Sequence, residues 1–211
     1  MTQTPEAEVR RAIAAERRDL ADVLTGLPER RWDEPTLCAG WRVREVVAHM
    51  TMPFHYSTAR FMIGMLRARG NFNRMADRSA RRDAASLSSG ELAALLRDNA
   101  DFAWKPPGGG FEGALTHEVI HGLDFTVPLG LDRHVPEDRL RIVLGGFEAS
   151  KSLRYFGVDI RGIELRADDL DWSIGDGTPM YGAAQDLILV LCGRKLPEGR
   201  LRGEPSHRFV A

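Results

Sequence analysis

The sequence predicts a mainly α-helical protein, in which a helical bundle is followed by a small β-β-β-α segment. Apolar residues recur at helical spacing through most of the first 157 residues, with turn residues between the runs. The pattern then changes to three short runs typical of strands, 162–168, 171–177 and 178–182, before one apolar helix at 183–192. We therefore predict two domains, residues 1–158 and 159–211.

The first helix has clear signals at both ends. Thr4 can cap it, and Pro5 suits the first helical position. Apolar residues recur at helical spacing from Val9 to Leu24, and Gly26 interrupts the run.

A second helix is predicted from about Trp41, with Val43 and Met50 on its apolar stripe. Pro53 should kink or divide it, because proline removes a backbone donor and clashes with the preceding turn. Helical residues then resume through Leu66.

The middle of the chain is less regular. Residues 68–90 are rich in Arg, Asn, Ser and Gly, and we expect a mobile, partly helical connection. Further helices are predicted at 91–104, at 111–127 and from 136 to about 157. The polar tail after Arg194 is expected to be loosely held.

The composition excludes several function classes. Hydrophobic residues make up 43% and charged residues 28%, as in ordinary globular proteins. The 29 basic residues are balanced by 30 acidic ones, which argues against nucleic acid, and the arginine runs at 10–18 and 78–82 are interpreted as solvated helix faces. No apolar run reaches the roughly 20 residues that span a membrane, and no secretory signal begins the chain. With only Cys38 and Cys192, we expect a reduced, cytoplasmic protein.

Three histidines are the candidate metal ligands. His117 and His121 stand four residues apart on one predicted helix, so their rings project from the same side and can grip one cation. Such a pair also arises by chance, and ordinary core histidines are the alternative. His49 lies at the edge of the second helix's apolar stripe, where a bundle would point it inward. Three imidazoles with one open position are typical of a catalytic zinc rather than a closed structural one.

Two carboxylates could support these ligands. Glu118 falls on the apolar face of its helix, so it needs a buried partner: a ligand histidine, the metal or an arginine. Asp124 lies on the same side as His117 and could orient an imidazole.

The remaining candidates are interpreted as ordinary residues. His55, His134 and His207 are expected to be solvated, and Cys38 is read as a packed structural thiol rather than a redox thiol. The glycines at 108–110 lack the Lys-Ser/Thr of a phosphate loop, and no nucleophile-elbow or dinucleotide motif occurs.

Three stretches resemble one family. PTLCAGWRVREVVAHM (35–50) resembles the signature of mycothiol-dependent maleylpyruvate isomerase-like proteins, THEVIHGLDFTVPLG (116–130) resembles their second metal-binding helix, and 162–194 resembles their C-terminal domain. The likeness covers most of the chain apart from residues 68–110. It implies a DinB-like four-helix bundle holding a divalent metal, expected to be zinc, on His49, His117 and His121. Nickel, cobalt and iron(II) also suit three histidines.

The resemblance also implies a chemistry. A small thiol, mycothiol, would bind the metal as thiolate and be transferred to a small electrophile or isomerise it. Glu118 or Asp124 would hold a ligand imidazole, and Arg194 would bind a substrate carboxylate or merely end its helix. The isomerase itself has a glutamate in place of His117, so maleylpyruvate isomerisation is not carried over.

Two other functions stay open. The same three ligands could activate a hydroxide that hydrolyses an amide or ester, with no thiol required. The chain could also be a non-catalytic metal-binding or stress-response protein. The sequence indicates no oligomeric state.

Overall fold

The computed structural model describes residues 4–148 and 156–211. Its first part is helical: α1 (Glu6–Thr25), α2 (Val43–His55), α3 (Thr58–Arg67), α4 (Phe72–Ser86), α5 (Ser89–Asp98), α6 (Gly110–Thr126) and α7 (Glu137–Glu148). The second part contains β1 (Ile163–Ala167), β2 (Ser173–Gly175), β3 (Thr178–Gly182), α9 (Ala184–Leu191) and β4 (Leu201–Arg202). Short 3₁₀ helices lie at Glu29–Asp33 and Glu204–Phe209. Within the described residues, no helix is long and apolar enough to cross a membrane.

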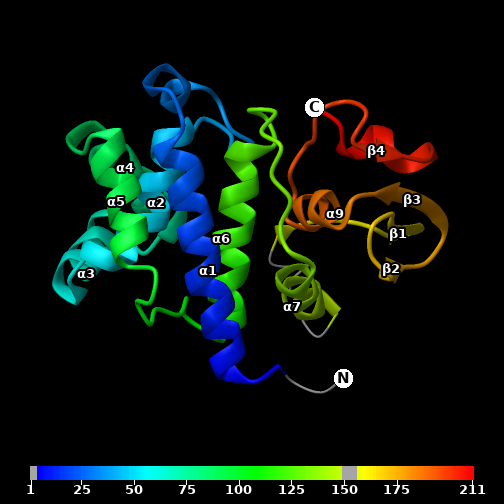
Figure 1. Cartoon of the computed structure of the whole chain (residues 1–211), viewed down its shortest axis with the longest axis horizontal. Helices are drawn as coiled ribbons and strands as arrows, with labels where there is room; N and C mark the ends of the chain where they lie inside the picture. Colours follow the sequence, from blue (N-terminus) through cyan, green and yellow to red (C-terminus); the bar gives the residue numbers. More distant parts are fainter. Residues whose placement is uncertain (1–3, 149–155) are drawn as a thin grey trace.

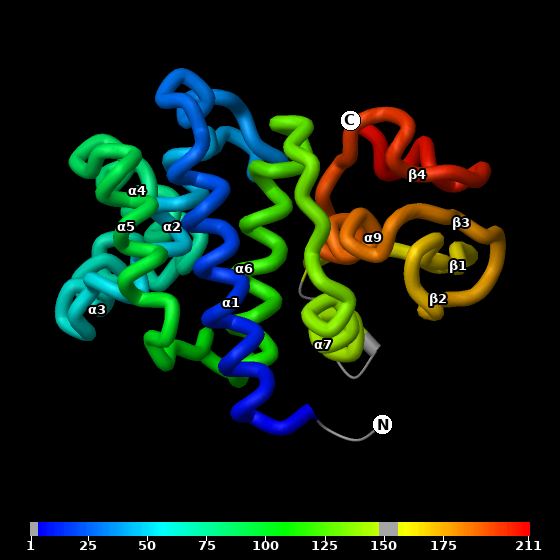
Figure 2. The backbone as a smooth tube through the Cα atoms, viewed as in Figure 1, coloured from blue at the N-terminus to red at the C-terminus, as the bar shows by residue number. Residues whose placement is uncertain are grey.

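Four helices form the bundle. Each of α1 and α2 packs against both α5 and α6, which closes a ring of four. Figure 1 shows α1 and α6 running along the middle of the molecule, with α2, α3, α4 and α5 on one side and α7, α9 and the sheet on the other. The tube in Figure 2 shows the same arrangement, with α9 between α6 and the sheet.

The close approach of α1 and α6 depends on Gly122. A Cβ atom built on this residue would lie 2.7 Å from Cδ2 of Leu20, so a larger side chain would push the two helices apart. Gly122 directly follows His121 in the chain. The helix carrying two candidate ligands therefore lies close against α1.

The break that Pro53 predicts is present, slightly later than the proline itself. Helix α2 continues to His55, and α3 begins at Thr58. Ser57 caps α3, because its side chain accepts a hydrogen bond from the backbone N–H of Arg60.

Residues 68–90 are partly helical, as predicted, but the helix is longer than the weak pattern indicates, and the predicted mobility stays a prediction. Most of this segment is helix α4, which packs along α2. Its buried face is built largely from small residues, among them Ala76, Ala80 and Ala84. Small residues at helical spacing are only weakly hydrophobic, so the apolar periodicity of this segment is weak.

The predicted third helix ends too late. Helix α5 stops at Asp98 rather than near Trp104. The guanidinium of Arg17 donates hydrogen bonds to the backbone carbonyls of Asn99, Ala100 and Phe102, at 3.1, 3.2 and 2.8 Å. These contacts tie the turn that follows α5 to α1, so the end of α5 depends on a residue about 80 positions earlier in the chain. Helix α7 begins where predicted, but the predicted end near Gly157 follows residues 149–155, which lie outside the described residues.

The C-terminal segment is a four-stranded sheet in the order β2-β1-β3-β4. β1 pairs with β2 in antiparallel and with β3 in parallel orientation. The chain crosses from β2 to β3 at Gly177, where a Cβ would lie 2.3 Å from the carbonyl oxygen of Gly162 and φ is 123°. Only glycine fits this crossing.

The expectation of a loose tail after Arg194 is wrong. β4 pairs with β3, and Leu196, Leu201 and Phe209 are buried in the core shared by α6, α7, α9 and the sheet. The predicted β-β-β-α order is therefore confirmed but extended by a fourth strand. The domain boundary near residue 158 stays a prediction.

Candidate metal centre

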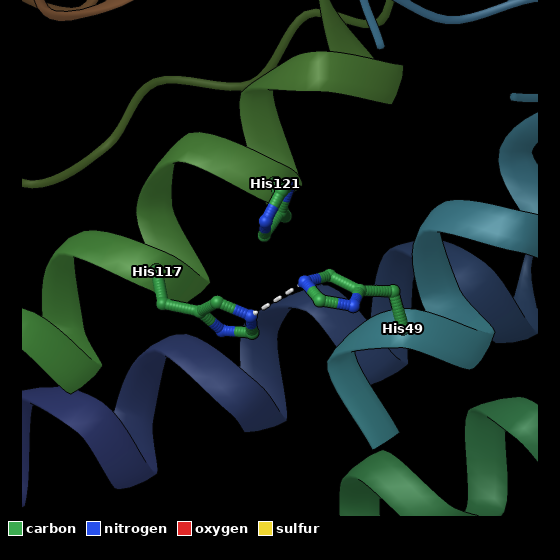
Figure 3. A group of neighbouring side chains, drawn as sticks. All are labelled: His49, His117 and His121. Carbon is green, nitrogen blue, oxygen red and sulfur yellow. Dashed lines mark hydrogen bonds between the residues drawn. The ribbon is translucent and has the colours of Figure 1, made fainter. Parts of the chain in front are cut away.

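Three histidines converge between α2 and α6. His49 comes from α2, and His117 and His121 come from successive turns of α6 (Figure 3). One ligand atom from each ring lies within 4.8 Å of the other two. Ring centroids are 5.1 Å apart for His49–His117, 4.9 Å for His49–His121 and 4.6 Å for His117–His121. The structure thus brings together the three side chains that the helical spacing selected.

The separation of the ring nitrogens fits a divalent metal. Nε2 of His49 and Nε2 of His117 are 3.3 Å apart. Two imidazoles bound tetrahedrally at about 2.0–2.1 Å would place their nitrogens about 3.3–3.4 Å apart. The same distance suits one imidazole donating to the other, so the geometry fits a metal without requiring one.

Burial keeps these rings in the form that binds metal. It lowers the pKa of His49 to about 3, with a further contribution from nearby His121. Burial also lowers the pKa of His117 well below its ordinary value. Both rings are therefore neutral at neutral pH, and neutral imidazole is the ligating form.

His121 is held by a buried carboxylate. Its Nδ1 is 2.9 Å from Oδ2 of Asp124, so Nε2 is the ring nitrogen left for the histidine group. The Arg194 guanidinium donates to both oxygens of Asp124, at 2.7 and 2.9 Å. Burial opposes ionisation of Asp124, but the hydrogen bonds from Arg194 and His121 hold its pKa well below the usual range. A carboxylate behind a ligand histidine fixes the tautomer and orientation of the ring.

The imidazole that Asp124 contacts is that of His121, and its predicted orienting role stays a prediction. The guanidinium of Arg194 pairs with Asp124 behind the histidines and also donates to the backbone carbonyl of Cys192, which ends α9. The two predicted roles of Arg194 stay predictions. Arg194 ties the C-terminal segment to the site through the Asp124 carboxylate.

Glu118 is buried, as predicted, and its partner is an arginine. Nε of Arg17 donates to Oε1 of Glu118 at 2.9 Å, and both side chains are almost fully inaccessible. Burial raises the pKa of Glu118 to about 7 despite the ion pair. Its second oxygen, Oε2, lies 3.9 Å from Nδ1 of His117.

Arg17 was wrongly assigned to a solvated face. The sequence contained the signal, because Arg17 is four residues after Ile13 and three before Leu20, on the apolar stripe of its helix. A basic residue on such a stripe indicates a buried partner.

A second possible ligand group shares His121. Cys38, His121 and Asp124 also offer three ligand atoms within 4.8 Å of one another. Arg194 already lies against this group, with Nη2 3.4 Å from the Cys38 sulfur. A metal here would face the guanidinium charge and compete for the Nδ1 of His121, so the three-histidine group is the better cation site.

Two tryptophans border the histidines. The ring of Trp41 is 5.2 Å from that of His49, and the ring of Trp104 is 5.2 Å from that of His117. Trp41 is held in place because its indole N–H donates to Asp77 of α4 at 2.8 Å. Sequence reasoning assigned no role to either tryptophan.

The other histidines behave differently from one another. His134 has an 83% exposed side chain, and His207 is exposed, as predicted. The same prediction is wrong for His55, which is partly buried and bonds to the carboxylate of Asp83 at 3.1 Å.

Comparison with known proteins tests the family resemblance. Residues 13–104 match the family described as the mycothiol maleylpyruvate isomerase N-terminal domain. The crystal structure of the mycothiol-dependent maleylpyruvate isomerase is similar, with a TM-score of 0.62 at 15% identity over 98% of this chain and 97% of that chain. A histidine-to-alanine mutant of that isomerase gives the same values. No curated protein matches the chain in sequence.

The predicted family resemblance is confirmed. The structural likeness establishes the fold, so the DinB-like, mainly helical class with a small sheet is confirmed as well. The matched family region contains His49 but ends before α6. The proximity of His49 to His117 and His121 in the isomerase-like fold therefore rests on the structure itself.

Proposed function

We propose that the chain is a metal-dependent enzyme that uses a small thiol, mycothiol, for transfer to or isomerisation of a small electrophilic substrate. One observation supports the metal: three imidazoles from two helices converge, with a ligand nitrogen of each within 4.8 Å of the other two. The thiol is inferred from the similar proteins, since the matched family is named for mycothiol and the similar crystal structure is of a mycothiol-dependent enzyme. We further propose zinc as the metal, since a group of three histidines with one open position suits it.

The protein's own residues would act as a scaffold. His49, His117 and His121 would hold the metal, with Asp124 and Arg194 fixing the ring of His121. A metal bound in this way supplies an open coordination position that lowers the pKa of a bound thiol and keeps it as thiolate. Because all three ligands are neutral, the double positive charge is left for an anionic ligand.

Trp41 and Trp104 would shape the space beside the histidines. Their indole rings lie next to two of the three imidazoles, where they limit access of water and offer apolar surface to the electrophile. A thiolate protected from water adds to an electrophilic carbon more readily. Addition alone gives transfer, and later elimination after bond rotation gives isomerisation.

The first test is metal content by mass spectrometry, measured on wild type and on the His117→Ala/His121→Ala double variant. About one metal per chain in wild type, lost in the double variant, is expected. The His134→Ala variant is the matched control, since it removes an exposed histidine whose only ion pair is with exposed Asp132. A wild type that stays metal-free after incubation with zinc or nickel would contradict the proposal.

The second test is thiol-dependent turnover of a panel of electrophiles. Metal-loaded wild type should conjugate or isomerise a substrate only when mycothiol is added, and the double variant should not. Turnover without any thiol would instead support the metal-hydroxide alternative.

A further inference from the structure

Unpartnered polar atoms gather around His117. Among the described residues, buried side-chain atoms without a hydrogen-bond partner are Arg17 Nη2, His49 Nδ1, His117 Nδ1, Glu118 Oε2 and Arg133 Nη1. Four of these five belong to the metal centre or the ion pair beside it. Buried polar atoms usually find partners, so a cluster of exceptions needs an explanation.

Two of these atoms face each other. Nδ1 of His117 and Oε2 of Glu118 are 3.9 Å apart. This separation is about 1 Å longer than a hydrogen bond, and a small rotation of the imidazole would close it. The donor and acceptor types also match, provided that His117 carries its proton on Nδ1.

Arg17 fixes the carboxylate in this orientation. Its Nε donates to Oε1 of Glu118, its Nη1 donates to three backbone carbonyls, and its guanidinium lies 4.8 Å from the ring centroid of Phe54. The close packing at Gly122 keeps α1 near enough for these contacts. Oε1 is therefore committed to Arg17, and Oε2 remains for His117.

We propose that Arg17 and Glu118 form a positioning pair for His117, in which Oε2 of Glu118 accepts the Nδ1–H of His117 and leaves Nε2 for the metal. The inference rests on the metal site of the proposed function and does not depend on the thiol chemistry. It gives both ligands of α6 the same support, because Asp124 and Arg194 already hold His121 in this way.

The Glu118→Gln variant tests this hydrogen bond sharply. Arg17 can only donate, so it would take the amide oxygen and turn the NH₂ group toward His117. An amide donor there favours a proton on Nε2, which blocks the ligating nitrogen. We expect zinc affinity, measured by competition with a chromophoric chelator, to fall about 10–100-fold, as for other residues that support a ligand histidine.

Glu16→Gln is the matched control. Glu16 is a fully buried glutamate of α1 that pairs with Arg133 and Arg139. Its replacement disturbs a buried ion pair of similar kind but touches no histidine. Zinc affinity should stay within about threefold of wild type in this control, even where stability falls.

A double-mutant cycle separates positioning from general structural damage. In a His117→Ala background, Glu118→Gln should leave the residual zinc affinity unchanged, because the ring through which Glu118 acts is gone. An equal loss in both backgrounds would mean a structural role and overturn the inference.

The Arg17→Met/Glu118→Leu variant tests the role of the pair if Glu118→Gln does not fold. Apolar replacement of a buried ion pair often preserves the fold. This variant should be folded yet bind zinc about tenfold more weakly than wild type. If it bound zinc as tightly as wild type, this inference would be overturned, but the proposed function would not. Absence of zinc binding by the wild-type protein would overturn the proposed function itself, and the inference with it.

Discussion

Two buried carboxylates in this molecule have similar partners and different consequences. The Asp124 cluster consists of Asp124 with His121, Arg194 and Cys38. The Asp83 cluster consists of Asp83 with His55, Arg60, Arg82 and Tyr56. Each joins a buried aspartate to an imidazole, to guanidinium and to a hydroxyl or thiol donor. In each, burial opposes ionisation, but the hydrogen bonds hold the pKa of the aspartate below its ordinary value.

The difference lies in the second nitrogen of each imidazole. His55 uses Nε2 on Asp83 and Nδ1 on the backbone carbonyl of Thr51 at 3.0 Å, so both nitrogens have partners. His121 uses only Nδ1 on its aspartate, and the ring faces His49 and His117 (Figure 3). A histidine becomes available to a metal when its own helix does not occupy the remaining nitrogen.

The largest expected effect is on metal binding by single histidine variants. His121→Ala should lower zinc affinity by more than the 10–100-fold typical of supporting residues, because it removes a ligand. His55→Ala should leave affinity unchanged, although it leaves Asp83 short of one partner. Zinc titration of both variants checks this comparison. Equal losses in the two would show that the centre lies elsewhere or that the histidines only stabilise the fold.

The next effect concerns the carboxylates themselves. Asp124→Asn should weaken zinc binding about 10–100-fold, since the amide supports the His121 ring less well. It should also cost about 3–5 kcal/mol of stability, because Arg194 loses its partner in a buried pair. Asp83→Asn should leave zinc affinity intact and cost less stability, since Arg60 and Arg82 are 42% and 52% exposed and screened by water. Chemical denaturation with zinc titration measures both quantities, and a zinc defect in Asp83→Asn would remove the contrast.

The identity of the three histidines could be predicted from the sequence, but the occupancy of their ring nitrogens could not. Helical spacing on one helix selected His117 and His121, and the apolar stripe of another selected His49, because ligands of a bundle site must lie on inward faces. The spacing could not show which ring nitrogen of each histidine is occupied. That property depends on contacts such as Arg194–Asp124, which join residues 70 positions apart.

Long-range contacts also explain the errors in the fold. The extent of helix α4 is not predicted because its buried face is built largely from small residues, whose burial depends on the partner helix α2. The packed tail is not predicted because Leu196 and Leu201 are single apolar residues in a polar stretch, and they are buried only against the core of the sheet. By contrast, β1, β2, β3 and α9 have strong local patterns, and the sequence predicts them correctly.

The loss of stability in acid also distinguishes the metal centre from the two aspartates. Burial lowers the pKa of His49 to about 3, so in the metal-free protein the unfolded chain binds a proton before the folded one as the pH falls. This stability is present above pH 6.5 and is lost progressively between pH 6.5 and 3, which is a higher window than that of either aspartate. At pH 5, His49 should contribute a loss of about 2 kcal/mol. Denaturation of metal-free wild type and His49→Gln at pH 7 and 5 checks this, and an unchanged pH dependence in the variant would contradict it.

The smallest expected effect concerns the thiol and hydroxyl donors of the two clusters. Tyr56→Phe removes a 2.7 Å hydrogen bond to Asp83 and should cost about 1 kcal/mol. Cys38→Ser replaces the thiol that donates to Asp124 at 2.9 Å with a hydroxyl donor, and it should change stability by less than that. Zinc affinity should be unchanged in both variants.

Cys38→Ser also tests whether the nucleophile is the Cys38 thiol or an external thiol. Burial, followed by the charge of Asp124, raises the pKa of the Cys38 thiol, so little of it is thiolate at neutral pH. The variant should therefore retain mycothiol-dependent turnover, measured by the loss of free thiol with an electrophile present. Lost turnover with intact zinc binding would make Cys38 the reacting sulfur. Retained turnover leaves Cys38 as a hydrogen-bond donor to Asp124, the counterpart of Tyr56 at Asp83, and leaves the nucleophile to an external thiol.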